Sequence, residues 1–117
     1  MKKLILISAL LFSFKLSAYD PQDLNKLINT NECMKCDLSG INMSFKDLSG
    51  ADLYRSNLED ANFSGADLEA ANLSRVKAKG ANFKGANLKF ATLHTPDFTR
   101  ANFEEADMTG ARFEGSS

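Results

Sequence analysis

The sequence predicts an all-β solenoid built from consecutive five-residue units. Sixteen units follow one another from Cys36 to Gly115 without an insertion, and they fill residues 36–115. A fixed repeat of this kind marks an architecture in which each unit buries its apolar side chains by stacking on its neighbours. A period of five does not keep to one face of an α-helix, whose apolar residues recur every three or four positions.

The pattern inside each unit indicates which side chains face inward. Position 1 is Ala in ten of the sixteen units, position 3 is Leu, Phe or Met in fifteen, and position 2 is Asp or Asn in thirteen. Because side chains of an extended chain alternate between its two sides, positions 1 and 3 are expected to point inward and position 2 outward. Positions 4 and 5 favour a turn, and the Asp and Asn side chains are expected to hold the corners by bonding nearby backbone amides.

The run of ADLxx and ANFxx units resembles the pentapeptide-repeat proteins, and the resemblance extends over 80 residues. In that family four units make one coil, so the resemblance implies a right-handed quadrilateral β-helix of about four coils. Side chains 20 residues apart should then stack in columns of similar character. One such column holds Met43, Phe63, Phe83 and Phe103, and another holds Leu48, Leu68, Leu88 and Met108.

Residues 1–18 have the pattern of a cleavable signal peptide. A positive start at Lys2 and Lys3 precedes an apolar stretch over residues 4–16, and small residues then offer a cleavage site before Tyr19. The apolar stretch is shorter than the roughly 20 residues that a membrane span needs, which favours cleavage over anchoring. We therefore expect an exported protein, periplasmic or secreted, with no membrane span after cleavage.

Both ends of the solenoid need a cap. Asp20 and Pro21 form a typical helix start, and apolar residues at helical spacing predict a short amphipathic helix over residues 21–30. This helix belongs to an N-terminal cap, residues 19–35. The last coil carries large apolar side chains and is followed by a tail, residues 116–117. Either these side chains close their own end, or a second copy of the chain covers it in a homodimer.

The pair Cys33-x-x-Cys36 has four interpretations. The favoured one is a structural disulfide between cap and first coil, because an oxidising compartment stabilises disulfides. Two cysteines without a nearby histidine do not complete a zinc site. A redox-active pair requires a helix N-terminus in a thioredoxin-like setting, which the sequence does not indicate. Two free, buried cysteines are the remaining alternative. We expect no metal and no cofactor.

Large side chains at outward positions are the candidate contacts for a partner. Phe45 and Phe90 occupy position 5, which normally faces solvent or a corner, and Tyr54 occupies position 4. Scattered exposed apolar groups are nevertheless ordinary on protein surfaces. His94 is the only histidine, and without a nucleophile at a recognisable spacing it is expected to be a solvated turn residue.

Charge gives little support to a nucleic-acid partner. The formal net charge is −1, and removal of residues 1–18 leaves 11 basic and 15 acidic residues. Basic residues gather in the third coil and acidic ones in the second, and pairing between neighbouring coils is favoured over an anionic-ligand patch. The basic set is Arg75, Lys77, Lys79, Lys84 and Lys89, and the acidic set is Glu59, Asp60 and Glu69.

The sequence carries no catalytic constellation, so we do not expect an enzyme. The leading hypothesis is a non-catalytic exported scaffold or protein-binding rod whose partner is unknown. One alternative is a thiol or disulfide-active protein that uses Cys33 and Cys36. The other is the gyrase-protecting, DNA-mimicking role known for some members of the family. This chain departs from those members because it is short, only mildly acidic and expected to be exported.

Overall fold

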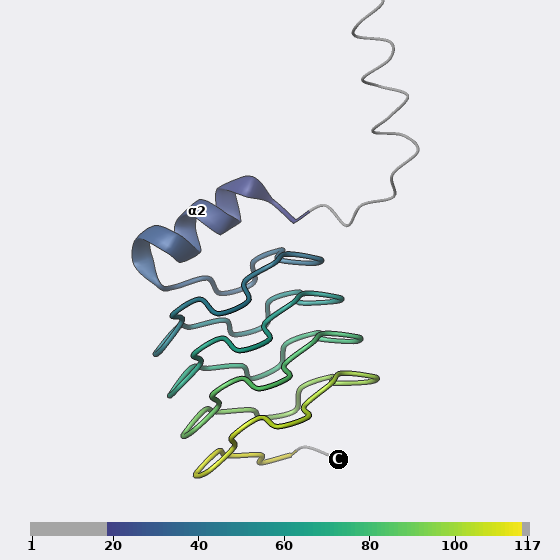
Figure 1. Ribbon diagram of the computed structural model, residues 1–117. Coiled ribbons are helices and arrows are strands. Elements are labelled where there is room, and N and C mark those ends of the chain that lie inside the picture. Colours follow the sequence, from purple (N-terminus) through teal and green to yellow (C-terminus); the bar gives the residue numbers. More distant parts are fainter. Residues whose placement is uncertain (1–18, 116–117) are drawn as a thin grey trace, which may run out of the picture.

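The computed structural model describes residues 19–115, which form a four-sided solenoid with one helix at its N-terminal end (Figure 1). Helix α2 spans Pro21–Thr30 and lies across the first coil. The predicted signal peptide and the tail at residues 116–117 lie outside the described residues. Within residues 19–115, no helix has the length and apolar character that a membrane crossing requires.

Helix α2 begins and ends where the sequence predicts. The Asp20 side chain accepts a hydrogen bond from the Gln22 N–H at 2.9 Å, with Pro21 at the first helical position. The helix ends at Asn31, whose backbone is left-handed with φ of 60°. Leu27 is 1% exposed beneath the helix, and the Asp37 N–H donates to the Asp23 carboxylate at 2.8 Å. These contacts fix α2 to the first coil.

Successive coils pair through parallel bridges between residues 20 apart. Thirteen such bridges occur between Glu32 and Arg112, each joining the position-2 residues of two units. Four units therefore make one turn of the coil. The bridges involve single residues and do not extend into longer strands, because each edge is only two or three residues long before the chain turns.

The solenoid starts one unit earlier than the repeat count indicates. Glu32 pairs with Asp52, and Cys33 points inward at 0% exposure, so residues 31–35 belong to the first coil and not to the cap. The repeat pattern is hard to recognise there because Asn31 stands at a position that most units give to alanine. The cap is therefore shorter than residues 19–35 and consists essentially of α2.

The predicted columns of stacked side chains are present in the core. Phe63 and Phe83 stack with ring centroids 5.3 Å apart, and Phe83 and Phe103 stack at 5.0 Å. From the neighbouring side of the coil, Phe98 meets Phe103 edge-on at 4.8 Å and Phe83 at 5.7 Å. Such ring contacts stabilise the fold beyond the contribution of the apolar area that each ring buries. Phe83 thus lies at the centre of a four-ring cluster.

The position-2 Asp and Asn side chains form the corners, as predicted. In all thirteen units that carry Asp or Asn there, the side-chain oxygen accepts a hydrogen bond from the backbone N–H two residues later, at 2.9–3.2 Å. Where position 4 is Ser or Thr, its hydroxyl often donates to the same oxygen, as Ser49 does to Asp47 at 2.7 Å. Each turn therefore satisfies its own backbone donor.

These turns predict a specific sensitivity to acid. Hydrogen bonds from the hydroxyl and then from the N–H of the residue at position 4 lower the pKa of Asp47, Asp97 and Asp107 below the ordinary value of 3.8. A carboxylate whose pKa is lower in the folded state stabilises the fold above its unfolded pKa, and this stabilisation is lost as the pH falls through the folded pKa. Acid should therefore weaken these corners below about pH 4.

We expect the triple variant Asp47→Asn, Asp97→Asn, Asp107→Asn to keep the turns, because asparagine makes the same turn in other units. Its midpoint of thermal unfolding should fall less than that of the unmodified chain between about pH 6 and about pH 3. An equal fall in both proteins would show that the three carboxylates do not contribute to acid sensitivity.

Candidate functional site

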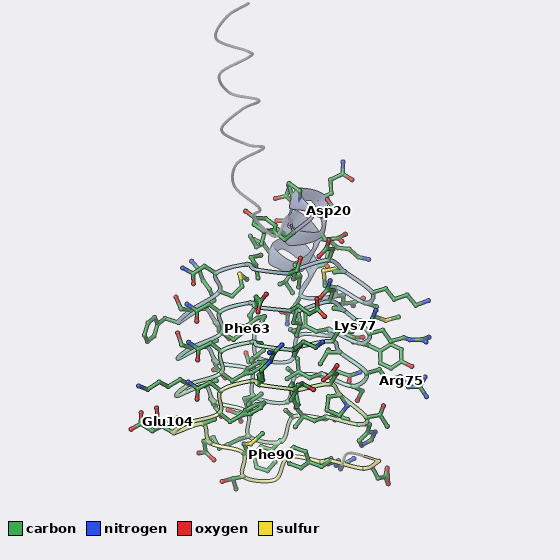
Figure 2. The ribbon with its side chains drawn as sticks, turned by 90° about the vertical axis from the view of Figure 1, so that its right-hand side faces the viewer. Asp20, Phe63, Arg75, Lys77, Phe90 and Glu104 are labelled. Carbon is green, nitrogen blue, oxygen red and sulfur yellow. A yellow bond between two sulfur atoms is a disulfide. The ribbon has the colours of Figure 1, made fainter. Side chains whose placement is uncertain are left out.

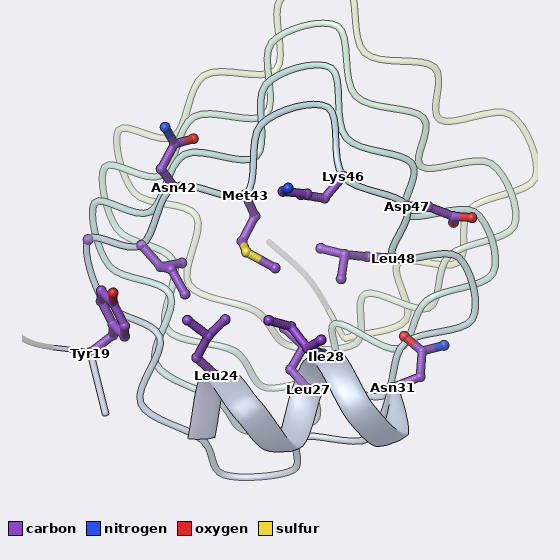
Figure 3. A pocket seen from close by; sticks show the side chains of 12 residues that line it. Tyr19, Leu24, Leu27, Ile28, Asn31, Asn42, Met43, Lys46, Asp47 and Leu48 are labelled. Atoms are coloured by element: carbon purple, nitrogen blue, oxygen red, sulfur yellow. The ribbon is translucent and has the colours of Figure 1, made fainter. Parts of the chain in front are cut away.

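A cavity of about 610 Å³ opens between α2 and the first coil (Figure 3). Figure 3 shows α2 along one edge of the square coil, so the helix covers the solenoid's open end only in part. The size lies within the range of about 300–1,000 Å³ that is typical of small-molecule sites. The cavity is lined by Tyr19, Leu24, Leu27, Ile28, Asn31, Gly40, Ile41, Asn42, Met43, Lys46, Asp47 and Leu48.

The floor of the cavity is apolar and belongs to the first coil. Ile41, Met43 and Leu48 lie there with exposed fractions of 3–4%. On the helix side the exposure is uneven, because Leu27 is buried whereas Ile28 is 65% exposed. The cavity therefore has a closed apolar floor and a wall that is open to solvent.

Lys46 is the one cationic side chain of this lining, and the sequence reasoning missed it. It occupies position 1, which faces inward, and Figure 3 shows its side chain directed into the cavity. The residues below it in the same column are Ala66, Ala86 and Ala106. A lysine fits at the top of this column because no further coil of residues 19–115 lies above it. A charged residue at an inward position was the signal that could have revealed the site.

The rim of the cavity is polar and already bonded. The Asn31 side-chain amide donates to the Ser49 carbonyl at 2.9 Å. Asp47 directs its carboxylate away from the cavity in Figure 3 and accepts hydrogen bonds from the N–H and hydroxyl of Ser49. The Asn42 side chain makes the same kind of turn with Ser44. The charge that faces the interior of the cavity is therefore the Lys46 ammonium group.

The two cysteines lie together in the first coil. Their Sγ atoms are 2.02 Å apart and their Cα atoms 5.4 Å apart, and both residues are buried. Because residues 31–35 form a coil unit, the pair encloses a corner of the first coil and does not join cap to coil. Buried Ser56 lies in the coil below. Its hydroxyl donates to the Cys33 carbonyl at 2.5 Å and accepts from the Cys36 N–H at 3.0 Å.

The three predicted contact residues lie on different sides of the solenoid. Phe45, Tyr54 and Phe90 belong to three different columns of units, so the structure does not bring them together into one patch. Phe45 and Phe90 remain 81% and 57% exposed. Each ring also covers a glycine 20 residues later, because a Cβ atom on Gly65 would collide with the Phe45 ring and one on Gly110 with the Phe90 ring.

The regular repeat is matched by two models of known families. Residues 32–69 match the family described as pentapeptide repeats (8 copies), and residues 78–117 match pentapeptide repeats (9 copies). Together the two matches cover about two thirds of the chain. The chain belongs to the pentapeptide-repeat family. No protein of curated function matches the sequence significantly.

Solved structures of other pentapeptide-repeat proteins have the same fold. One is alr5209 from Nostoc Pcc 7120, with 20% identity, a TM-score of 0.68 and coverage of 82% of this chain and 96% of that one. Another is HetL from Nostoc sp. Strain PCC 7120, a protein involved in heterocyst differentiation regulation, with 31% identity and a TM-score of 0.62. That match covers 74% of this chain and 44% of HetL. These likenesses support a right-handed quadrilateral β-helix.

Two of the third-coil cations of this pentapeptide-repeat protein, Lys84 and Lys79, interact with acids of the fourth coil. Lys84 Nζ lies 3.4 Å from a Glu104 carboxylate oxygen. The pKa of Asp97 is lowered first by hydrogen bonds from Thr99 and to a smaller extent by the positive charge of Lys79. These exposed pairs contribute little to stability, but they reduce the net charge on their sides of the solenoid.

One corner of the solenoid keeps unpaired positive charge. Lys35, Arg55 and Arg75 lie 20 residues apart at position 5, so they form a row down this corner, and Arg75 projects outward in Figure 2. Among residues 19–115, no carboxylate lies within 4.0 Å of their charged groups. Glu32 and Asp52 stand at position 2 on the same side without reaching them. We call Lys35, Arg55 and Arg75 the basic corner.

His94 lies at a turn of the fourth coil, as expected. Its side chain is 36% exposed, and its Nε2 atom is 3.8 Å from a Glu114 carboxylate oxygen. Within the described part of the chain, no cluster of three or more His, Cys, Asp or Glu side chains is placed to hold a metal ion.

Proposed function

We propose that this protein is a non-catalytic exported rod that binds an acidic protein partner along its basic corner. Membership in a repeat-scaffold family supports the non-catalytic part of the proposal. The observation that carries the contact is the fixed spacing of Lys35, Arg55 and Arg75, which follow the coil repeat of about 4.8 Å. The backbone N–H of each residue donates to a carbonyl of the next coil, at 2.8–3.0 Å, which holds the row in place and lowers the ordering cost of binding.

The basic corner is unfavourable for the protein alone. Like charges that face each other across neighbouring strands are destabilising. All three residues also have left-handed backbone, with φ between 58° and 61°, a conformation that glycine adopts more easily. An acidic surface laid along the corner would neutralise the row. Tyr54 lies beside it, with its ring 5.9 Å from the Arg55 guanidinium carbon, and supplies an aromatic contact.

The proposal is tested by recovering partners from periplasmic extract with the mature chain and with charge-reversed variants. We expect Arg55→Glu together with Arg75→Glu to lower the recovery of a specific partner at least tenfold, and added salt to weaken binding of the unmodified chain. The matched control is Lys84→Glu together with Lys89→Glu, which changes the net charge equally on other sides. If both double variants recover the same amount, the basic corner is not the contact.

Single alanine variants separate the three aromatic candidates. Tyr54→Ala should weaken recovery because Tyr54 adjoins the basic corner, whereas Phe45→Ala and Phe90→Ala should leave recovery unchanged because their rings lie on other sides. A loss confined to the Phe45 or Phe90 variant would move the proposed contact to that side of the rod.

We further propose that residues 1–18 are removed on export and that Cys33 and Cys36 form a disulfide in the mature chain. The Cα–Cα separation of 5.4 Å and the burial of both residues support a structural pair, and an oxidising compartment favours its disulfide form. Mass spectrometry of the exported protein should find a chain that begins at Tyr19 and takes up no alkylating agent without reductant. Two alkylated thiols in the native protein would instead favour the thiol-active alternative.

The exposed C-terminal end supports the proposal of a homodimer through the last coil. Phe98, Phe103 and Met108 are only partly buried there, and Phe113 is 43% exposed. None of the described residues covers them, and burial of their apolar surface against a second copy would be favourable. Light scattering should give the mass of a dimer for the mature chain. A monomer at high protein concentration would contradict the proposed dimer.

A further inference from the structure

We infer that the cavity under α2 is a binding site for a small anionic amphiphile, a molecule with an apolar body and one negatively charged head group. The apolar body would lie on the floor formed by Ile41, Met43 and Leu48, and Lys46 would bind the head group. This site does not use the basic corner, so it stands apart from the proposed protein contact.

The shape and lining of the cavity fit such a ligand. Small-molecule sites are mostly apolar, with a few polar groups that fix the ligand's orientation. Here the floor is closed, because its three side chains are only 3–4% exposed, while Ile28 and Lys46 are exposed at the opening. The long Lys46 side chain can turn toward an apolar chain that lies on the floor, and Ile28 offers apolar surface beside it.

Lys46 supplies the charge complementarity. Within residues 19–115 its ammonium group has no carboxylate within 4.0 Å, and Figure 3 shows it directed into the cavity. Its column continues as alanine in every lower coil, so the packing pattern of the repeat does not require a lysine here. A lysine stem packs on apolar surface while its head group seeks a polar partner, and an anionic head group provides that partner next to the apolar floor.

Charge also argues against two other occupants. Residues 1–18 are apolar and directly precede Tyr19, but they contain Lys2, Lys3 and Lys15 and no acidic residue, so they offer no anion to Lys46. A second copy joined through the same end would bring a second Lys46 toward the first. An anionic amphiphile avoids both conflicts and buries its apolar chain as well.

The experiment measures the binding of three probes that share a twelve-carbon chain and differ in head group: dodecanoate, dodecanol and dodecylamine. Isothermal titration uses both the full chain and the mature chain from Tyr19, below the concentration at which the probes form micelles. We expect dodecanoate to bind one molecule per chain, dodecanol to bind about tenfold more weakly, and dodecylamine not to bind. Equal affinity for all three, or no binding of dodecanoate to either chain, would overturn the proposal.

Variants locate the site and separate charge from packing. Lys46→Met removes the charge, keeps most of the apolar stem and should weaken dodecanoate binding about tenfold without changing the affinity for dodecanol. Lys46→Arg should retain binding, and Lys26→Met, a lysine of α2 outside the cavity lining, is the matched control. Ile28→Ser should weaken the binding of both dodecanoate and dodecanol, because it removes apolar surface from the exposed wall of the cavity. Unchanged dodecanoate binding in Lys46→Met would show that Lys46 only solvates the open end of the solenoid.

Discussion

Replacement of Phe83 by alanine is expected to lower the free energy of unfolding by about 3–5 kcal/mol. The Phe83 side chain is fully buried and lies between the stacked rings of Phe63 and Phe103, with Phe98 against its edge. Alanine would leave a cavity at the centre of this cluster. The coils above and below are held at a fixed spacing by backbone bridges, so they cannot close around the gap. Denaturant unfolding followed by circular dichroism measures the change.

Phe83→Leu is the control for this prediction. Leucine fills position 3 in half of the counted units, so this variant keeps most of the buried volume and should cost much less than the alanine variant. Phe90→Ala tests the opposite case, because the Phe90 ring is largely exposed and should contribute little to stability. If Phe83→Ala and Phe90→Ala had similar effects, the four-ring cluster would not be the centre of the core.

The second large effect is expected from Ser56→Ala, at about 2–4 kcal/mol. The Ser56 hydroxyl satisfies two backbone groups of the first coil, the Cys33 carbonyl and the Cys36 N–H. Ser56 is 0% exposed, so water cannot easily replace its hydroxyl group. Alanine fits the site by shape, since it is the commonest residue at position 1. The loss therefore measures the unsatisfied backbone groups and not a packing defect.

Ser74→Ala is the matched control for this variant. Ser74 is also buried, but its hydroxyl accepts a single backbone hydrogen bond, from the His94 N–H at 3.2 Å. Its replacement should cost clearly less than that of Ser56. Thermal unfolding of the two variants side by side, with the cysteines in the same oxidation state, distinguishes them. Equal losses would mean that the Ser56 bonds have no special importance.

The repeat made the core and corners predictable because each unit obeys the same local rules. The alternation of positions 1 to 3 identifies the inward side chains, and the position-2 Asp and Asn make the turn bonds that their spacing indicates. The first unit, residues 31–35, was missed because pairing 20 residues away decides its geometry. Its own pattern is weak: Asn31 stands at position 1 and only Cys33 points inward.

The candidate sites were less predictable because they depend on where the regular pattern stops. Lys46 obeys the five-residue period in position but not in residue type, and its role depends on the partial cover that α2 provides. The position of the Phe45 and Phe90 rings is explained by the coil directly below each ring, which the five-residue spacing does not indicate. Each covers a glycine 20 residues away, where the backbone would otherwise be open to solvent.

The pairing of each coil only with the coils directly above and below it limits how far a disturbance can spread. In such a linear array stability is approximately a sum of unit terms and nearest-neighbour terms, so a change at one end weakens with each interface that it crosses. A ligand bound beside Lys46 would therefore have little effect on association through Phe113. The rod could carry two separate binding equilibria, with a coupling free energy near zero between its ends.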